Sequence, residues 1–285
     1  TGTCDCYLKL TDATFHTAVT DWLNGGATQT AVTTSFNTID LWDTSLVTDM
    51  ASPFCGAANS ATFDDDISAW DTSQVTSMQR MFYCATAFNQ NVGGWDVENV
   101  QDFSGMFESA AGSAFNNDGS SSIDDWDTRS ATTTSSMFEN ADSFDQPVGK
   151  WDLSQVLDVS AMFKGATAFD QDIATWDVSQ VTDFSEMLHT AILFDQDIRN
   201  LDFSAAVSTS DMLTGAAAFN VNCNLVNALT AVSGIDASAL GASTVCHACD
   251  AGTDGCPAGS QCTKVQAVDT GFFTSFQCQA VTTHW

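Results

Sequence analysis

The dipeptide Trp-Asp recurs through the middle of the chain with a period of 25 residues, interrupted by two longer intervals of 28 and 31 residues. The six copies are Trp42-Asp43, Trp70-Asp71, Trp95-Asp96, Trp126-Asp127, Trp151-Asp152 and Trp176-Asp177, and Leu201-Asp202 is a degraded seventh. A period of roughly 20 to 50 residues predicts stacked units, because one such unit is too short to bury its apolar side chains alone. This regularity leaves little room for a unique catalytic arrangement, so we expect no enzymatic activity.

Further positions keep the same register as Trp-Asp. Met-Phe or a related pair begins eleven residues after each Trp, an Ala stands three residues after that Phe, and Phe-Asn or Phe-Asp opens the next unit. Relative to this pattern, extra residues fall at positions 58–62, after Ala110, and at 119–122. These segments are small, polar or rich in glycine, which predicts loops at an edge of the stack.

The apolar residues of one unit follow neither the strict alternation of a strand nor a sustained helical period. In one copy they are Phe169, Ile173, Trp176, Val181, Phe184, Met187, Leu188 and Ala191. We therefore expect short strands separated by turns, with β-branched residues pairing in parallel between units. The prediction is a mainly β fold, a parallel-stacked solenoid of about seven coils. It divides the chain into an N-terminal cap (1–35), the solenoid (36–220) and a Cys-rich cap or EGF-like module (221–285).

Two stretches of the repeat resemble a known family. The strings FDQDIATWDVSQVTDFSEML and FDQPVGKWDLSQVLDVSAMF are similar to the repeat of the BspA-like surface proteins, a divergent leucine-rich-repeat group. The resemblance extends over about residues 36 to 220 and matches several columns of the repeat. It implies an extracellular solenoid of divergent leucine-rich-repeat type that faces a ligand or matrix and has no catalytic residues.

The N-terminal segment has the pattern of an amphipathic helix. Phe15, Val19, Trp22 and Leu23 stand at helical spacing after Asp12, which we expect to be the N-cap, and Asn24-Gly25-Gly26 predicts the end of the helix. This helix is expected to cover the first coil.

Ten cysteines favour an oxidising compartment. Cys55 and Cys84 follow their Phe residues by one and two places in adjacent units, which predicts a disulfide between coils. Cys4 and Cys6 either pair within the N-terminal cap or reach elsewhere. The other six are Cys223, Cys246, Cys249, Cys256, Cys262 and Cys278. They indicate a disulfide-stapled module, and the alternative is a zinc site that includes His247.

The repeated Asp admits two interpretations. A column of carboxylates about 5 Å apart in a stack must be compensated. In the structural interpretation each Asp accepts hydrogen bonds from the turn that follows, where Ser or Thr helps to close it. The functional alternative is calcium, a hard cation that binds several carboxylate and carbonyl oxygens. The best calcium candidates are two clusters beside the insertions: Asp64, Asp65 and Asp66, and Asp124, Asp125 and Asp127. No other cofactor is indicated.

The repeated Trp likewise admits two interpretations. Exposed aromatic rings stack on sugars, so a row of Trp could form a glycan platform. Recurrence at a fixed apolar position favours the core instead.

The four histidines, His16, His189, His247 and His284, are scattered, and no hydrolase, zincin or nucleotide-binding motif occurs. His189 occupies a variable position and is expected to face solvent.

Charge and targeting signals favour a place outside the cell. The chain has 7 Lys plus Arg against 36 Asp plus Glu, a formal net charge of -29. This charge disfavours nucleic acid and anionic membranes as partners. The chain has no initiator Met and no long apolar run, which suits a processed, secreted form without membrane insertion. We expect a cell-surface or matrix protein with a structural or adhesive role, acting as a filament or coat subunit. The alternative is a monomeric recognition module for a protein or polysaccharide. Partners would be further copies of the chain, another extracellular protein or a glycan.

Overall fold

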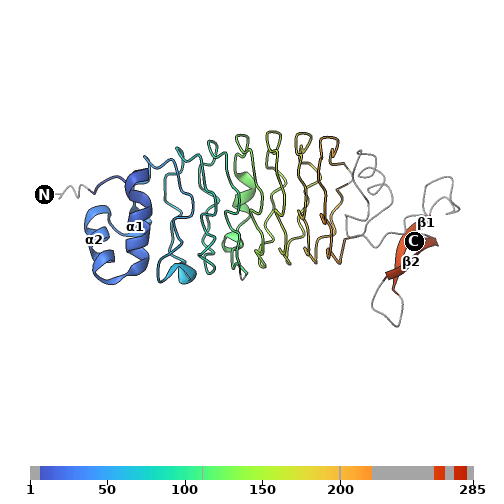
Figure 1. Ribbon diagram of the computed structural model, residues 1–285, viewed down its shortest axis with the longest axis horizontal. Helices are drawn as coiled ribbons and strands as arrows, with labels where there is room; N and C mark the ends of the chain where they lie inside the picture. Colours follow the sequence, from blue (N-terminus) through green and yellow to red (C-terminus); the bar gives the residue numbers. More distant parts are fainter. Residues whose placement is uncertain (1–6, 111, 199, 220–259, 267–272, 281–285) are drawn as a thin grey trace.

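The computed structural model describes residues 7–110, 112–198, 200–219, 260–266 and 273–280, and Figure 1 shows their arrangement. Helices α1 (Asp12–Asn24) and α2 (Gly26–Phe36) lie at one end of an elongated row of stacked repeats. The repeats contain four short 3-10 helices, η1 (Ile39–Leu41), η2 (Ser60–Thr62), η3 (Asn117–Gly119) and η4 (Ser121–Asp125). Strands β1 (Ser260–Gln266) and β2 (Phe273–Ala280) form an antiparallel pair.

Backbone hydrogen bonds join each repeat to the next. A ladder of single parallel bridges runs through the residues Asp49, Ser77, Asp102, Thr133, Asp158, Asp183 and Ser208. Beside it, Leu157 N donates to Thr132 O at 3.0 Å and Thr182 N donates to Leu157 O at 2.9 Å. The repeats are therefore in register along the whole row, one residue of each contributing to the bridge ladder.

The predicted mainly β, leucine-rich-repeat solenoid is wrong. Within the described repeats no regular strand forms, and β1 and β2 are the strands that the described residues contain. The physical reason is that the backbone is not extended on either side of the bridge residue, although hydrogen bonds to the next repeat continue beyond it. Before the bridge residue Asp183, Val181 N donates to Val178 O and closes one turn. After it, Met187 N donates to Phe184 O and closes a second turn, in which Glu186 has a φ of 56°. A tight turn before the bridge residue, and a turn with a left-handed residue after it, prevent a longer extended segment.

Columns of aromatic rings form the core. The six repeat Trp side chains are at most 4% exposed, which confirms that they belong to the core and do not form a surface platform. Phe138 stacks on Phe163 of the next repeat at 5.5 Å and on Phe144 of its own at 3.9 Å between ring centroids. The column of the Phe that opens each unit is continuous from Phe63 to Phe219, because this Phe recurs in every unit. The Met-Phe column ends with leucines, Leu188 and Leu213, in the last two repeats.

Helix α1 covers the N-terminal end of the row of repeats. Phe15, Val19 and Leu23 are buried, as predicted. The N-cap is Thr11, where Asp12 was expected, because the Asp12 carboxylate is engaged elsewhere. It accepts hydrogen bonds from the main-chain N–H groups of Thr48 (2.7 Å) and Asp49 (3.2 Å) and from the Thr48 hydroxyl. The Asp12 carboxylate thus accepts the hydrogen bonds that main-chain carbonyl groups of a preceding repeat accept further along the row.

Helix α2 follows α1 directly and was not predicted. Gly25 and Gly26 both have positive φ, 69° and 63°, so they allow a sharp change of direction without a connecting loop. Among the described residues, no helix is both long and apolar enough to cross a membrane.

Candidate functional site

The Asp of each Trp-Asp pair closes a turn. Ser179 N donates to Asp177 Oδ1 at 3.1 Å, and hydrogen bonds from the Ser179 side chain and then its backbone lower the pKa of Asp177. The same main-chain bond joins Asp43 to Ser45, Asp71 to Ser73, Asp96 to Glu98, Asp127 to Arg129, Asp152 to Ser154 and Asp202 to Ser204. The structural interpretation of this column is confirmed.

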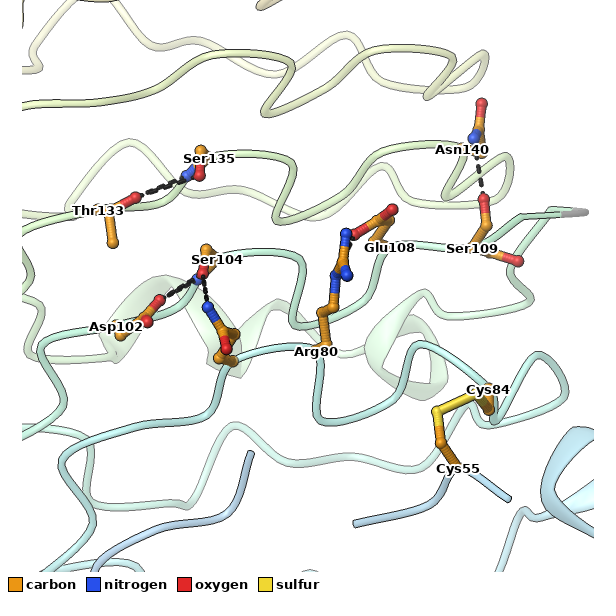
Figure 2. Close-up of polar contacts among 11 residues, drawn as sticks. Cys55, Arg80, Cys84, Asp102, Ser104, Glu108, Ser109, Thr133, Ser135 and Asn140 are labelled. Carbon is orange, nitrogen blue, oxygen red and sulfur yellow. Dashed lines mark hydrogen bonds and ion pairs between the residues drawn. A yellow bond between two sulfur atoms is a disulfide. The ribbon is translucent and has the colours of Figure 1, made fainter. Parts of the chain in front are cut away.

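A second set of turns lies in the bridge ladder. Ser104 N donates to Asp102 Oδ1 at 2.8 Å, and Ser135 N donates to Thr133 Oγ1 at 3.3 Å one repeat later (Figure 2). A hydroxyl therefore replaces the carboxylate at this position. Because Thr carries no charge, the role is to accept a backbone hydrogen bond and does not require an ion.

The three carboxylates of the first calcium candidate bond to three different partners. Asp66 accepts from Ser68 N at 2.9 Å, Asp65 accepts from Trp22 Nε1 at 2.7 Å, and Asp64 accepts from Asn89 N at 2.9 Å. These three partners lie in a turn, in α1 and in the next repeat, so consecutive carboxylates are drawn to different places.

The second candidate is neutralised by cations of the chain itself. Lys150 Nζ lies 3.2 Å from Asp124 Oδ2 and 2.8 Å from Asp125 Oδ1, whereas Asp127 pairs with Arg129. Across the part of the chain that the structure describes, no group of three or more His, Cys, Asp or Glu side chains is arranged to hold a metal ion. The carboxylates of both predicted clusters are thus engaged with groups of the chain itself, and calcium binding stays a prediction.

Cys55 and Cys84 form a disulfide with Cα atoms 5.1 Å apart (Figure 2). It joins the first two repeats close to the N-terminal helices. Cys262 in β1 and Cys278 in β2 are opposite each other in the strand register. The remaining predicted cysteines, Cys4, Cys6, Cys223, Cys246, Cys249 and Cys256, lie outside the described residues.

A network of charged side chains runs across the repeats and was missed by the sequence analysis. Arg80 Nε lies 3.2 Å from Glu108 Oε2 (Figure 2), and Lys164 contacts Glu139 at 3.4 Å and also pairs with Glu186. We call these five residues the charged edge. Burial is the largest influence on Glu108 and raises the pKa of its carboxyl. Successive members stand at related positions of the repeat, which is the signal that could have revealed them.

His189 lies one repeat beyond Lys164, at the same repeat position. The expectation that it faces solvent is wrong, since it is half-buried and its Nδ1 atom has no hydrogen-bond partner in the described structure.

The carboxylates of the charged edge are paired with Arg80 and Lys164. The two cations offset part of the negative charge of the three carboxylates where the repeats stack.

The sequence profile of one family matches the repeat region twice. The family is described as "Mycoplasma protein of unknown function, DUF285", and the matches cover residues 26–121 and 113–226. Together they span more than half of the chain. The chain belongs to the DUF285 family. No curated protein and no solved structure matches it.

DUF285 is a repeat family associated with BspA-like proteins. The two matches begin at the first residue of α2 and end after the last described repeat. Both α2 and the stacked repeats therefore fall within the region that defines the DUF285 family, whereas α1 and the β1–β2 pair fall outside it.

Proposed function

We propose that the chain is an extracellular, noncatalytic protein of a cell surface or matrix, with a structural or adhesive role. The observation that carries this proposal is how the shared positions of the repeat are used: Trp, Met and Phe fill the core and Asp closes turns. Only the outward, variable positions remain for a partner. A net charge of -29 and the Cys55–Cys84 disulfide support an extracellular place.

The resemblance of the repeat to BspA-like surface proteins supports the same location. Antibody labelling of native cells tests it. We expect labelling of intact cells or of the matrix around them. Labelling that requires permeabilised cells would contradict the proposal.

A specific observation favours a monomeric recognition module over a filament that grows end to end. Asp12 already occupies the N–H groups of Thr48 and Asp49, so a second chain cannot extend the backbone ladder at this end. A heterologous contact needs two open, complementary ends to propagate. Partners would then be a protein or polysaccharide bound along the side of the row. Sedimentation of the full chain should give one monomeric species, and a concentration-dependent series of oligomers would favour the filament.

A further inference from the structure

His189 carries a ring nitrogen whose hydrogen-bonding capacity is unused. The side chain is half-buried, and its Nδ1 atom is buried without a hydrogen-bond partner among the residues that the structure describes. The other histidine of that region differs, because His16 Nε2 lies 2.8 Å from Ala51 O. Buried polar atoms are nearly always paired in folded proteins, so the unpaired nitrogen calls for an explanation.

Main-chain hydrogen bonds hold His189 between two neighbouring repeats. Gly165 N of the preceding repeat donates to His189 O at 2.8 Å. On either side of His189, Leu188 N and Thr190 N donate to carbonyl groups of the next repeat at 2.9 and 2.8 Å. The segment is therefore fixed from both directions.

The next repeat also approaches this segment closely. Gly215 has a φ of 79°, and a Cβ atom in its place would lie 2.8 Å from Thr190 Cγ2 and 3.4 Å from Thr190 Cα. The backbone at Gly215 thus packs directly against the residue that follows His189. This contact leaves the segment little freedom to shift and give Nδ1 a partner.

Each repeat around His189 contributes one charged side chain. Lys164 occupies the same position one repeat earlier, Glu186 lies three residues before His189 in the same turn, and Asp211 follows Glu186 one repeat later. Lys164 disfavours a further positive charge, whereas the two carboxylates favour it. Glu186 already pairs with Lys164, and Asp211 accepts a hydrogen bond from Thr214 Oγ1 at 2.9 Å. The Glu186 side chain is 39% exposed and Asp211 is also exposed, so water weakens the attraction of both.

Protonation changes what the Nδ1 atom requires. A neutral imidazole with its proton on Nε2 leaves Nδ1 as an acceptor, whereas the imidazolium ion has an N–H donor at both nitrogens. A buried, charged donor without an acceptor costs more free energy than an unused acceptor. The surroundings of Nδ1 therefore accommodate the neutral ring of His189 better than the charged one.

We propose that His189 is a pH-sensitive switch that holds its repeat against the next one when neutral and loosens this contact when protonated. Histidine changes charge between about pH 5 and 8. Because the packed segment accommodates the neutral ring, its local stability is highest at neutral pH and falls as the ring gains a proton. The inference goes beyond the proposed function and does not depend on which partner the chain binds.

Hydrogen exchange of the full chain tests the switch, with rates at about pH 7.5 and about pH 5.5 corrected for intrinsic exchange. We expect the protection of Leu188 N and Thr190 N to fall about tenfold at the lower pH. Thr182 N, which donates to Leu157 O in the bridge-ladder segment of the same repeat, should keep its protection. In His189→Gln, whose side chain does not titrate, the protection of Leu188 and Thr190 should not change with pH.

His16→Gln is the matched control and should respond to pH as the wild type does, since His16 Nε2 has a partner. Thr182 covers the case in which His189→Gln does not fold, because that comparison lies within the wild-type chain. Unchanged protection of Leu188 and Thr190 in acid, or an equal loss at Thr182, would overturn the proposal. So would a pH response that persists in His189→Gln or disappears in His16→Gln.

Discussion

Each repeat Trp contributes a hydrogen bond as well as buried apolar area. Trp151 Nε1 donates to Ile123 O, and Trp176 Nε1 donates to Val148 O, both at 2.9 Å and both in the preceding repeat. The other four repeat Trp side chains also donate to main-chain carbonyl groups. In five of the six copies the indole is therefore a cross-link between repeats, whereas Trp42 donates to Asn37 of its own unit.

Replacing Trp151 by Phe removes that bond and leaves a small void. We expect Trp151→Phe to lower the free energy of unfolding by about 1 to 3 kcal/mol. Chemical denaturation measures this change. The control is Leu157→Ala at an exposed position, which should cost less than about 0.5 kcal/mol. Equal losses in the two variants would contradict the bridging role.

The Asp of the Trp-Asp pair makes stability depend on acidity. Because the pKa of Asp177 is lowered in the folded chain, its contribution is present above the unfolded pKa and is lost as pH falls through the folded value. We expect Asp177→Asn to lower the melting temperature at pH 7 and the difference from wild type to vanish once the pH falls below the lowered pKa of the folded state. Asp40→Asn, at an exposed position without a turn bond, is the control. A difference that persists in acid would contradict the assignment.

At the scale of elements, α1 is a cap because of a side chain and not only because of its apolar face. Asp12 satisfies two main-chain donors that would otherwise have no partner at the end of the ladder. We expect Asp12→Ala to cost about 1 to 3 kcal/mol and to speed hydrogen exchange at Thr48 and Asp49. Asp21→Ala, on the same helix, should do neither. Unchanged exchange at Thr48 would show that the carboxylate does not cap the ladder.

The pattern of the N-terminal segment was sufficient to predict α1, because Phe15, Val19 and Leu23 are spaced as a helix requires. The same pattern could not predict α2. Gly25-Gly26 predicts the end of a helix, but in the structure it forms a sharp bend after which a second helix begins. The strand prediction failed because a left-handed residue recurs in each repeat and no residue type marks it. In every described repeat the residue before the Met-Phe pair, or its equivalent, is left-handed. These residues are Ser52, Arg80, Gly105, Ser136, Ala161, Glu186 and Asp211. Only one of them is glycine, so no residue type marks the turn.

At the scale of the whole molecule, neighbours in sequence and neighbours in space are different sets. Asp64, Asp65 and Asp66 are consecutive in the chain, but their side chains bond to three different parts of the molecule. Arg80 and Glu108, by contrast, are 28 residues apart and form an ion pair because the stack places neighbouring repeats side by side. Site prediction from sequence therefore required the repeat register to be applied to polar residues as well as apolar ones.

Calcium removal is a test on the same scale. The carboxylates of both predicted clusters are engaged with main-chain N–H groups, Trp22 or the cations Lys150 and Arg129. We therefore expect thermal unfolding of the full chain to have the same midpoint in calcium and in excess chelator. A midpoint several degrees lower in chelator would show that an ion contributes to the stack.

Hydrogen exchange at single residues tests the stacking of the repeats most directly. Two sets of residues have exposed side chains but differ in their backbone bonds. The first set donates its N–H groups to the preceding repeat: Thr76, Gln101, Thr132, Leu157, Thr182 and Val207. The second set, two positions earlier, has no such bond: Gln74, Asn99, Gln155 and Gln180. We predict slow exchange in the first set and exchange at least about a hundredfold faster in the second. Similar rates in the two sets would contradict the stacked ladder.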